Sequence, residues 1–304
     1  MKSVQKFTLL ALLASSMLLA TPTLAATLPP ITQKESAVIN TLFAETKPQC
    51  IGRYIIDVPQ SFNNQLHDMI FIDDFKISSK WVYPPAFQQR IRLREQELRD
   101  SINKPGNDPQ NGPFIKEKIL LPEGKGVIFD SNRPGSDDLY RRLEAHVYVN
   151  MVAFIITADI RDFSAPKYKE RKAEYLKTTT EDQTNTKPAK LAALQSLISR
   201  LSGRKDEEIP RGKGLCIPNG FIRDDGATHN EKVTFRYEND DFFFGAEMNN
   251  TIKGSDDTLF NRSAEINKAL KTSNKYSIKK WPLHLAVFPA KHGCSVEIRR
   301  LQIQ

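Results

Sequence analysis

The chain has 304 residues, of which 39% are hydrophobic and 26% are charged, and it contains 14 Gly, 18 Pro and 3 Cys. These fractions are ordinary for a globular protein and exclude a collagen-like, low-complexity or disulfide-dense scaffold. A single hydrophobic core tends to divide near this length, so we expect two domains.

The first 25 residues have the pattern of a secretory signal peptide. Lys2 and Lys6 precede a mostly apolar run from Phe7 to Ala20, and a short exit segment follows up to Ala25. The apolar run is too short to span a membrane comfortably. We therefore predict a signal peptide over residues 1–25 and a mature protein in a bacterial periplasm, with no membrane anchor.

The charge of the mature chain is modest. Removal of Lys2 and Lys6 with the signal peptide leaves 42 basic and 36 acidic residues, a net charge of +6. Nucleic-acid binding requires clustered Lys and Arg with aromatic readers. The basic residues here alternate with apolar or acidic ones, so we expect no nucleic-acid partner.

Apolar periodicity, β-branched runs and turn residues predict the elements of the first part of the chain. They are a helix over 35–45, strands over 50–59 and 69–75, a helix over 84–102, strands over 114–121, 126–131, 139–149 and 151–160, and helices over 166–177 and 188–201. Consecutive strands joined by short polar turns favour an antiparallel sheet.

A charged segment over 203–213, with Pro210 and Gly212, is the predicted domain boundary. Beyond it the pattern predicts strands over 215–221, 232–237 and 242–248, a helix near 258–271, and short strands after residue 276. The predicted fold class is α+β in two domains, 26–203 and 204–304. Each domain is expected to be a mainly antiparallel sheet with flanking helices.

A search for catalytic signatures assigns no catalytic, cofactor-binding or metal-binding residue. The five histidines form no HExxH motif, and no GxSxG, GxxxxGK or GxGxxG segment is present. Five aspartate doublets fall at strand ends or turns, where Asp bonds to the local backbone. These doublets are Asp73-Asp74, Asp137-Asp138, Asp224-Asp225, Asp240-Asp241 and Asp256-Asp257. His146 lies in an apolar strand, which favours a structural role.

The three cysteines leave one without a partner. A bridge between Cys216 and Cys294 would close a loop inside the second half and is the candidate disulfide. Cys50 paired with either would instead tie the two halves together. Cys50 and Cys216 each lie in an apolar strand, where buried free thiols are a further alternative.

Two cysteine-led motifs resemble a known family. Segment 50–62 resembles the opening signature of immunity proteins that neutralise lipase and phospholipase effectors of the bacterial type VI secretion system, and segment 214–222 resembles the start of their C-terminal domain. The residues that carry the resemblance are Cys50, Gly52, Arg53, Tyr54, Asp57 and Pro59 in the first motif and Gly214, Cys216, Gly220 and Phe221 in the second. After about Tyr276 the chain departs from the family pattern, which indicates a diverged or truncated end.

The resemblance implies a periplasmic α+β protein without enzymatic activity or cofactor, monomeric when free. It would bind a lipase effector with both domains and hold the lipase lid region closed. One alternative is a periplasmic ligand-binding or envelope-assembly module without a lipase partner. The other is a secreted hydrolase built on the aspartate doublets and His146.

Protein interfaces favour exposed aromatic residues, Met and Arg at their centre. By that criterion the candidate interface residues are Trp81, Tyr83, Phe242, Phe243 and Phe244. For each of them the alternative is packing in the core.

Overall fold

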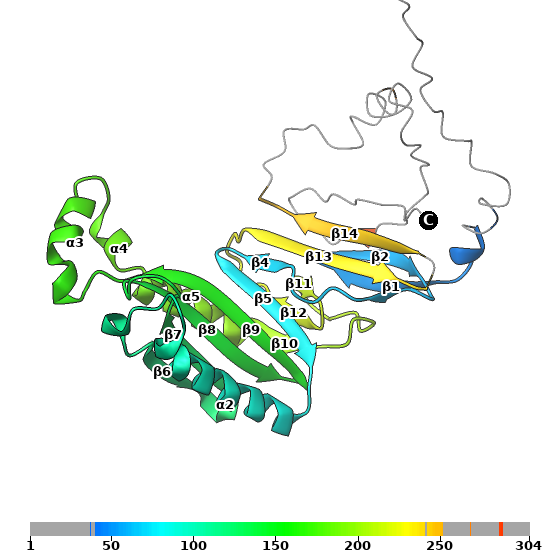
Figure 1. Ribbon diagram of the computed structural model, residues 1–304. Coiled ribbons are helices and arrows are strands. Elements are labelled where there is room, and N and C mark those ends of the chain that lie inside the picture. Colours follow the sequence, from blue (N-terminus) through cyan, green and yellow to red (C-terminus); the bar gives the residue numbers. More distant parts are fainter. Residues whose placement is uncertain (1–36, 38–39, 241, 252–267, 269–285, 288–304) are drawn as a thin grey trace, which may run out of the picture.

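The computed structural model describes residues 40–240 and 242–251, together with residues 37, 268 and 286–287. Its helices are α2 (Pro84–Asp100), α3 (Lys169–Tyr175), α4 (Glu181–Thr184) and α5 (Lys187–Arg200), with 3-10 turns η1 (Ser101–Asn103), η2 (Pro109–Asn111), η3 (Pro122–Gly124) and η4 (Pro166–Tyr168). Figure 1 shows these helices around long, twisted antiparallel sheets.

The largest sheet has nine strands. Eight follow the order β14 (Phe243–Asn249), β13 (Glu231–Glu238), β4 (Ile70–Ile72), β5 (Phe75–Trp81), β9 (Val152–Arg161), β8 (Tyr140–Val149), β7 (Gly126–Asn132) and β6 (Ile115–Leu121), and β3 (Asn63–Asn64) pairs with β13. All of these neighbours are antiparallel. The mainly antiparallel α+β fold is therefore confirmed.

Two smaller sheets complete the described part of the chain. One joins β1 (Thr46–Ile51), β2 (Tyr54–Pro59) and β15 (Ala286–Val287). The other joins β10 (Leu201–Gly203), β12 (Gly220–Arg223) and β11 (Gly214–Ile217). The predicted strands over 50–59 and 215–221 are thus wrong in one respect, since each segment turns back on itself within a β-hairpin.

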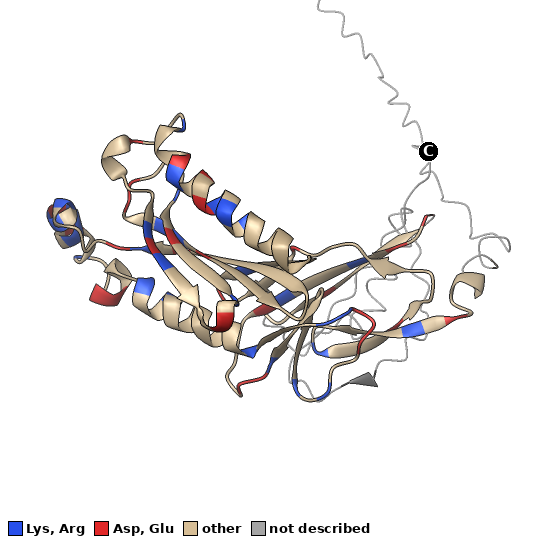
Figure 2. Ribbon diagram, turned by 90° about the horizontal axis from the view of Figure 1, so that it is seen from below, with Lys and Arg blue, Asp and Glu red and all other residues tan. Residues whose placement is uncertain are grey.

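The two long helices cover opposite faces of the large sheet, which lies between them in Figure 2. Phe87, Ile91 and Leu98 of α2 pack with Val127 and Phe129 of β7. The intervening Ile128 instead joins the main core, to which α5 contributes Leu194 and Leu197. Successive side chains of a strand point to opposite faces of the sheet. Val127 and Phe129 therefore face α2, whereas Ile128 faces the side covered by α5.

The large sheet draws strands from both halves of the chain. Strand β13 pairs with β14 on one side and with β4, more than 150 residues earlier in the chain, on the other. Strand β10 likewise pairs with β12 across the charged segment 203–213. The predicted boundary segment therefore lies between strands that are bonded to each other.

The helices predicted over 84–102 and 188–201 and the four strands from 114 to 160 are confirmed within a few residues. The helix predicted near 258–271 and most of the short strands predicted after residue 276 lie outside the described residues. Lys and Arg are interspersed with Asp and Glu over the ribbon, and neither sign gathers on one face (Figure 2).

His229 links two turns and makes stability depend on pH. Its Nδ1 lies 2.8 Å from Asp73 Oδ2, and its Nε2 lies 3.1 Å from Asp225 Oδ1. Burial alone would lower the pKa of His229, but the hydrogen bonds with Asp73 and Asp225 outweigh it and raise the pKa above 6.5. The stabilisation is therefore full below pH 6.5 and is lost as the pH rises through the higher folded-state pKa.

We expect the wild type to lose stability, relative to His229→Gln, when the pH is raised from 6.5 through this range. Urea unfolding of both proteins at a series of pH values measures the difference in midpoint. Parallel pH profiles for the two proteins would contradict the role of His229.

Candidate functional site

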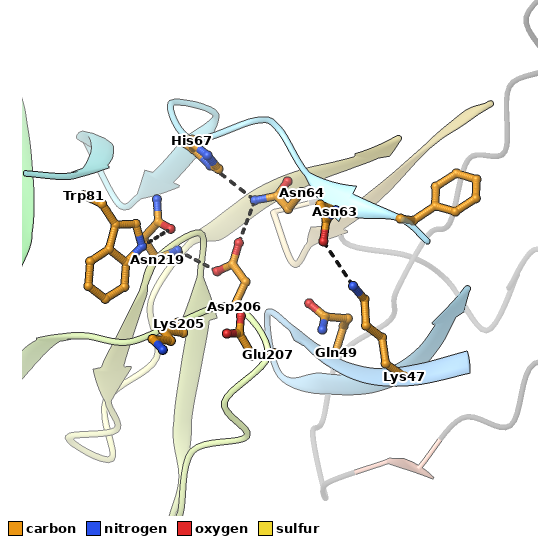
Figure 3. A pocket seen from close by; sticks show the side chains of 11 residues that line it. Lys47, Gln49, Asn63, Asn64, His67, Trp81, Lys205, Asp206, Glu207 and Asn219 are labelled. Carbon is orange, nitrogen blue, oxygen red and sulfur yellow. Dashed lines mark hydrogen bonds between the residues drawn. The ribbon is translucent and has the colours of Figure 1, made fainter. Parts of the chain in front are cut away.

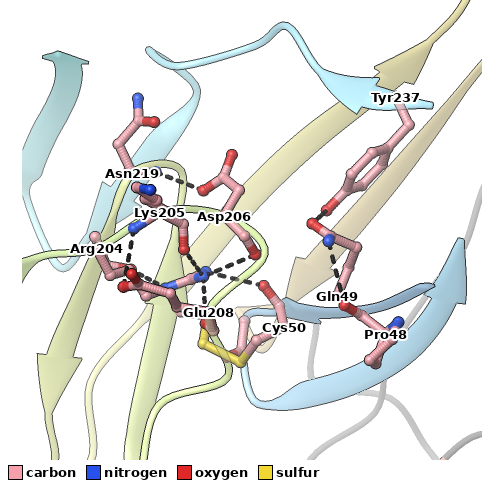
Figure 4. Close-up of a disulfide and its surroundings, with 12 residues drawn as sticks. Pro48, Gln49, Cys50, Arg204, Lys205, Asp206, Glu208, Asn219 and Tyr237 are labelled. Carbon is pink, nitrogen blue, oxygen red and sulfur yellow. Dashed lines mark hydrogen bonds between the residues drawn. A yellow bond between two sulfur atoms is a disulfide. The ribbon is translucent and has the colours of Figure 1, made fainter. Parts of the chain in front are cut away.

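The two cysteine-led motifs meet in the folded chain. Cys50 of β1 and Cys216 of β11 form a disulfide, with their Cα atoms 5.8 Å apart across a sequence separation of 166 residues (Figure 4). The predicted bridge between Cys216 and Cys294 is therefore wrong, because the Cys216 sulfur is already bonded. Paired backbone hydrogen bonds of 3.0 and 2.7 Å between Gly52 and Cys216 bring the two hairpins together. Cys294 lies outside the described residues.

Two motif glycines lie where a side chain would not fit. Gly52 turns the β1–β2 hairpin with φ of +59°, and a Cβ there would lie 2.5 Å from Sδ of Met248. A Cβ on Gly214 would lie 2.3 Å from the ring of Phe221. That ring packs with Cys50 and Cys216 in a small buried cluster. Glycine is thus required at both positions, at Gly52 by the packing of β14 and at Gly214 by the facing strand of its own hairpin.

The remaining motif residues also stabilise the region where the two cysteine-led hairpins meet, which we call the junction. Arg53 donates to both carboxylate oxygens of the buried Glu231, at 2.8 and 2.6 Å, and to Asp224 at 3.3 Å. Tyr54, Pro59 and Gly220 are buried, whereas Asp57 is exposed on β2. Except for Asp57, the motif therefore forms the interior of the junction rather than a binding surface.

Arg204 is a residue of the junction that the sequence analysis missed. Its side chain is buried, with the residue 6% exposed. Figure 4 shows its guanidinium donating to carbonyls of the loop that follows it, Lys205, Asp206 and Glu208, and to those of Gly220 and Cys50. Burial lowers the pKa of Arg204 below its usual value. An arginine in a charged linker carries no sequence signal for such a role.

A polar cleft of about 350 Å³ lies against this loop (Figure 3). Its lining comes from β1, β3, the end of β5, the loop after Arg204 and the β11–β12 turn. The lining residues are Lys47, Gln49, Phe62, Asn63, Asn64, His67, Trp81, Lys205, Asp206, Glu207 and Asn219. The cleft therefore lies where the two halves of the chain meet.

Hydrogen bonds fix most of the cleft wall. The carboxylate of Asp206 accepts from the backbone N–H of Asn219 at 2.7 Å and from Nδ2 of Asn64 at 3.0 Å. Nε1 of Trp81 donates to Oδ1 of Asn219 at 2.9 Å. Asn219 in turn donates to Ser79 at 3.2 Å. These bonds form one preorganised network from β3 to β5 (Figure 3).

The five candidate interface residues divide into two groups. Trp81 and Tyr83 are 41% and 75% exposed. Phe242 and Phe244 are partly buried against the main core, and the guanidinium of Arg236 lies 5.0 Å from the ring of Phe243. Only the first two combine large apolar area with clear exposure, and they lie at one end of the large sheet.

The residues of the hydrolase alternative lie apart from the cleft. His146 is buried, and its Nε2 lies 2.7 Å from Oε1 of Glu144. The two carboxylate oxygens of Glu144 each accept one hydrogen bond from Arg94. Burial alone would raise the pKa of Glu144, but the bonds from His146 and Arg94 outweigh it and lower the pKa to about 2. This arrangement is a buried ion network beneath α2.

The aspartate doublets within the described residues lie at turns and form ion pairs. The pairs are Asp73–His229, Asp74–Lys190, Asp137–Arg171, Asp138–Lys116, Asp224–Arg53 and Asp225–Arg200. Within the same residues no group of acidic, His or Cys side chains is arranged to hold a metal ion. A membrane-crossing helix is also not found there.

Two structures of known proteins have a similar fold. One is the apo structure of the immunity protein TplEi of the type VI secretion system from Pseudomonas aeruginosa, with 15% identity and a TM-score of 0.52 over 76% of this chain and 68% of that one. The other is the crystal structure of a Tle4–Tli4 complex, with 16% identity and a TM-score of 0.52 over 75% of this chain and 67% of that one. At these identities the likeness shows the fold. A comparison with curated proteins gives no match.

Family models cover both halves of the chain. The N-terminal domain of Tle cognate immunity protein 4 matches residues 47–204, and the C-terminal domain of the same family matches residues 208–292. The second match continues to residue 292, so the departure from the family pattern predicted after about Tyr276 is wrong for residues 277–292. Together the two matches span most of the sequence, and the chain belongs to the Tle cognate immunity protein 4 family.

Proposed function

We propose that this chain is the periplasmic immunity protein for a lipase effector of the type VI secretion system, and that it inhibits the effector by binding it. The observation that carries the proposal is the pair of family matches across residues 47–292. The structure of a Tle4–Tli4 complex, which shares this fold, supports direct binding of the effector.

Two features support the periplasm as the place of action. Residues 1–25 have the charge and hydropathy pattern of a signal peptide. The Cys50–Cys216 disulfide joins the two halves of the fold and persists in an oxidising compartment, whereas cytosolic thiols are kept reduced. Export and folding are therefore expected to be coupled.

Inhibition requires no chemistry from this chain. A protein that binds the closed form of a lipase more tightly than the open form shifts the equilibrium by its differential affinity. We propose that this protein holds the lid of the effector in its closed position. A lipase variant that lacks its lid is then expected to bind this protein more weakly than the intact lipase does, as measured by calorimetry.

Absence of catalysis is part of the proposal. The support is membership of a family of immunity proteins and the ion pairing of the aspartates described above. Purified protein is expected to hydrolyse neither phospholipid vesicles nor soluble esters. Turnover that disappears in His146→Ala while the fold survives would favour the hydrolase alternative.

A periplasmic toxicity rescue tests the function as a whole. The lipase encoded beside this gene is directed to the periplasm, with and without this protein, and surviving cells are counted. Rescue by the full chain is expected, and a chain lacking residues 1–25 is expected to fail. Equal rescue without the signal segment would contradict periplasmic action, and failure of the exported, folded protein would contradict immunity against this lipase.

A further inference from the structure

Three large exposed side chains surround one end of the large sheet. Trp81 is the last residue of β5, Tyr83 follows two positions later, and Met151 lies in the β8–β9 turn. Their exposed fractions are 41%, 75% and 40%. Met151 is adjacent to the other two, because its carbonyl accepts the backbone N–H of Val82 at 3.2 Å. We call Trp81, Tyr83 and Met151 the aromatic rim.

Met151 occupies a position that disfavours methionine. Val149 pairs with Val152, so Asn150 and Met151 form a two-residue hairpin turn, with φ of +51° and +66°. Such turns select Asn followed by Gly, because a side chain is strained in the left-handed region. Methionine is also an adaptable apolar residue at binding surfaces. The Tyr148 hydroxyl donates to Sδ of Met151 at 3.2 Å, yet Met151 stays 40% exposed in a turn that favours glycine.

The polar cleft adjoins the aromatic rim at Trp81 (Figure 3). One wall is the loop Asp206-Glu207, and among the described residues no cation lies within ion-pair distance of either carboxylate. Asp206 already accepts two hydrogen bonds, whereas Glu207 is exposed and makes no hydrogen bond or ion pair within the described residues, although its charge interacts with that of Arg204. Lys47 and Lys205 also line the cleft, so it presents charges of both signs, and the exposed carboxylate of Glu207 is the acidic group open to a cationic side chain.

Both parts of the surface are held rigidly before binding. Arg204 fixes the carbonyls of the acidic loop, and Asn219 connects that loop to the ring of Trp81. A preordered surface loses little conformational entropy on association. Large aromatic side chains surrounded by polar groups are typical of interface hot spots.

We propose that the aromatic rim and the Asp206-Glu207 wall are the surface on which this protein docks its lipase effector. The inference rests on the proposed function and adds the site and its chemistry. The effector segment that fits presents an apolar side chain to Trp81, Tyr83 and Met151. A neighbouring Lys or Arg of the same segment enters the cleft against Glu207.

The test measures binding of the purified lipase encoded beside this gene to three variants by calorimetry. Met151→Gly is expected to raise the thermal midpoint by about 2–4 °C, because glycine relieves the strained turn, and yet to weaken binding about tenfold. Tyr83→Ala is also expected to weaken binding about tenfold; the Tyr83 side chain makes no capping hydrogen bond to α2, so folding is retained. Glu207→Lys is expected to weaken binding by a similar factor and to change its salt dependence.

Matched controls lie on α3 and directly after it, at the other end of strands β8 and β9 from the aromatic rim (Figure 1). Leu176, after α3, is 37% exposed, and Glu170 of α3 is exposed. Leu176→Ala and Glu170→Lys are expected to bind like the wild type. If the wild type binds and the three rim and wall variants bind equally well, the docking surface is wrong. If the wild type itself does not bind this lipase, the proposed function fails for this lipase instead.

Discussion

Replacement of Cys50 and Cys216 together by serine is expected to lower the free energy of unfolding by about 3–5 kcal/mol. The bridge closes a loop across a sequence separation of 166 residues. The chain-entropy model assigns about 5 kcal/mol to a loop of this length, and measured losses for native disulfides reach about the same value. Urea unfolding of oxidised wild type and of the double variant measures the difference.

The reduced wild type provides the first control, since it should unfold at nearly the same urea concentration as the double variant. Cys294→Ser provides the second and should leave the Cys50–Cys216 bridge intact in peptide mapping under non-reducing conditions. A bridge that disappears in Cys294→Ser, or a double variant as stable as the oxidised wild type, would contradict this assignment. The result also bears on export, because a protein that needs this bridge reaches full stability only in an oxidising compartment.

Replacement of Arg204 by alanine is expected to destabilise the fold by about 4 kcal/mol, near the upper end of single-site effects. The change would leave buried carbonyls of Gly220 and Cys50 without their donor, and each such unsatisfied group costs about 1–3 kcal/mol. It would also release the carbonyls of Lys205, Asp206 and Glu208, so the loop should become accessible to trypsin at Lys205.

Arg211→Ala is the matched control, because Arg211 is exposed on the same connecting segment. It should change stability by less than about 0.5 kcal/mol and leave the rate of cleavage at Lys205 unchanged. Arg204→Lys should recover only part of the loss, since one ammonium group cannot replace a planar guanidinium with five donors. An Arg204→Ala protein with wild-type stability and protease resistance would show that the loop is held by other contacts.

The elements that the sequence predicted well are those specified by local patterns. Helix α2 begins at Pro84 and buries Phe87, Ile91 and Leu98 on one face, which the apolar spacing indicated. The strands from 114 to 160 are separated by short turn signals and follow one another in the sheet. The two cysteine-led segments were expected to be single strands but are hairpins. The second carries a turn signal in the sequence, Pro218-Asn219-Gly220, whereas the first turns at Gly52, a single glycine within a strand-like run.

The candidate site was predicted in part. Exposed aromatics at Trp81 and Tyr83 are visible as residue types, but the same reasoning selected Phe242 and Phe244, which pack against the core. Exposure depends on which face of a strand is covered, and residue type alone does not specify it. Met151 and Glu207 carried no signal, since their significance comes from a left-handed turn and from the position of the loop beside Trp81 in the folded chain.

The sequence by itself determined the mainly antiparallel α+β class and the family resemblance, because these depend on composition and on patterns within a few residues. The predicted secretory leader lies outside the described residues and stays a prediction. Only the tertiary structure decided the partner of Cys216, the role of Arg204 and the position of the cleft. Each of these depends on segments more than 150 residues apart that become neighbours when β13 pairs with β4 and β11 contacts β1. Such contacts arise from the joint packing of the whole chain, which no local pattern encodes.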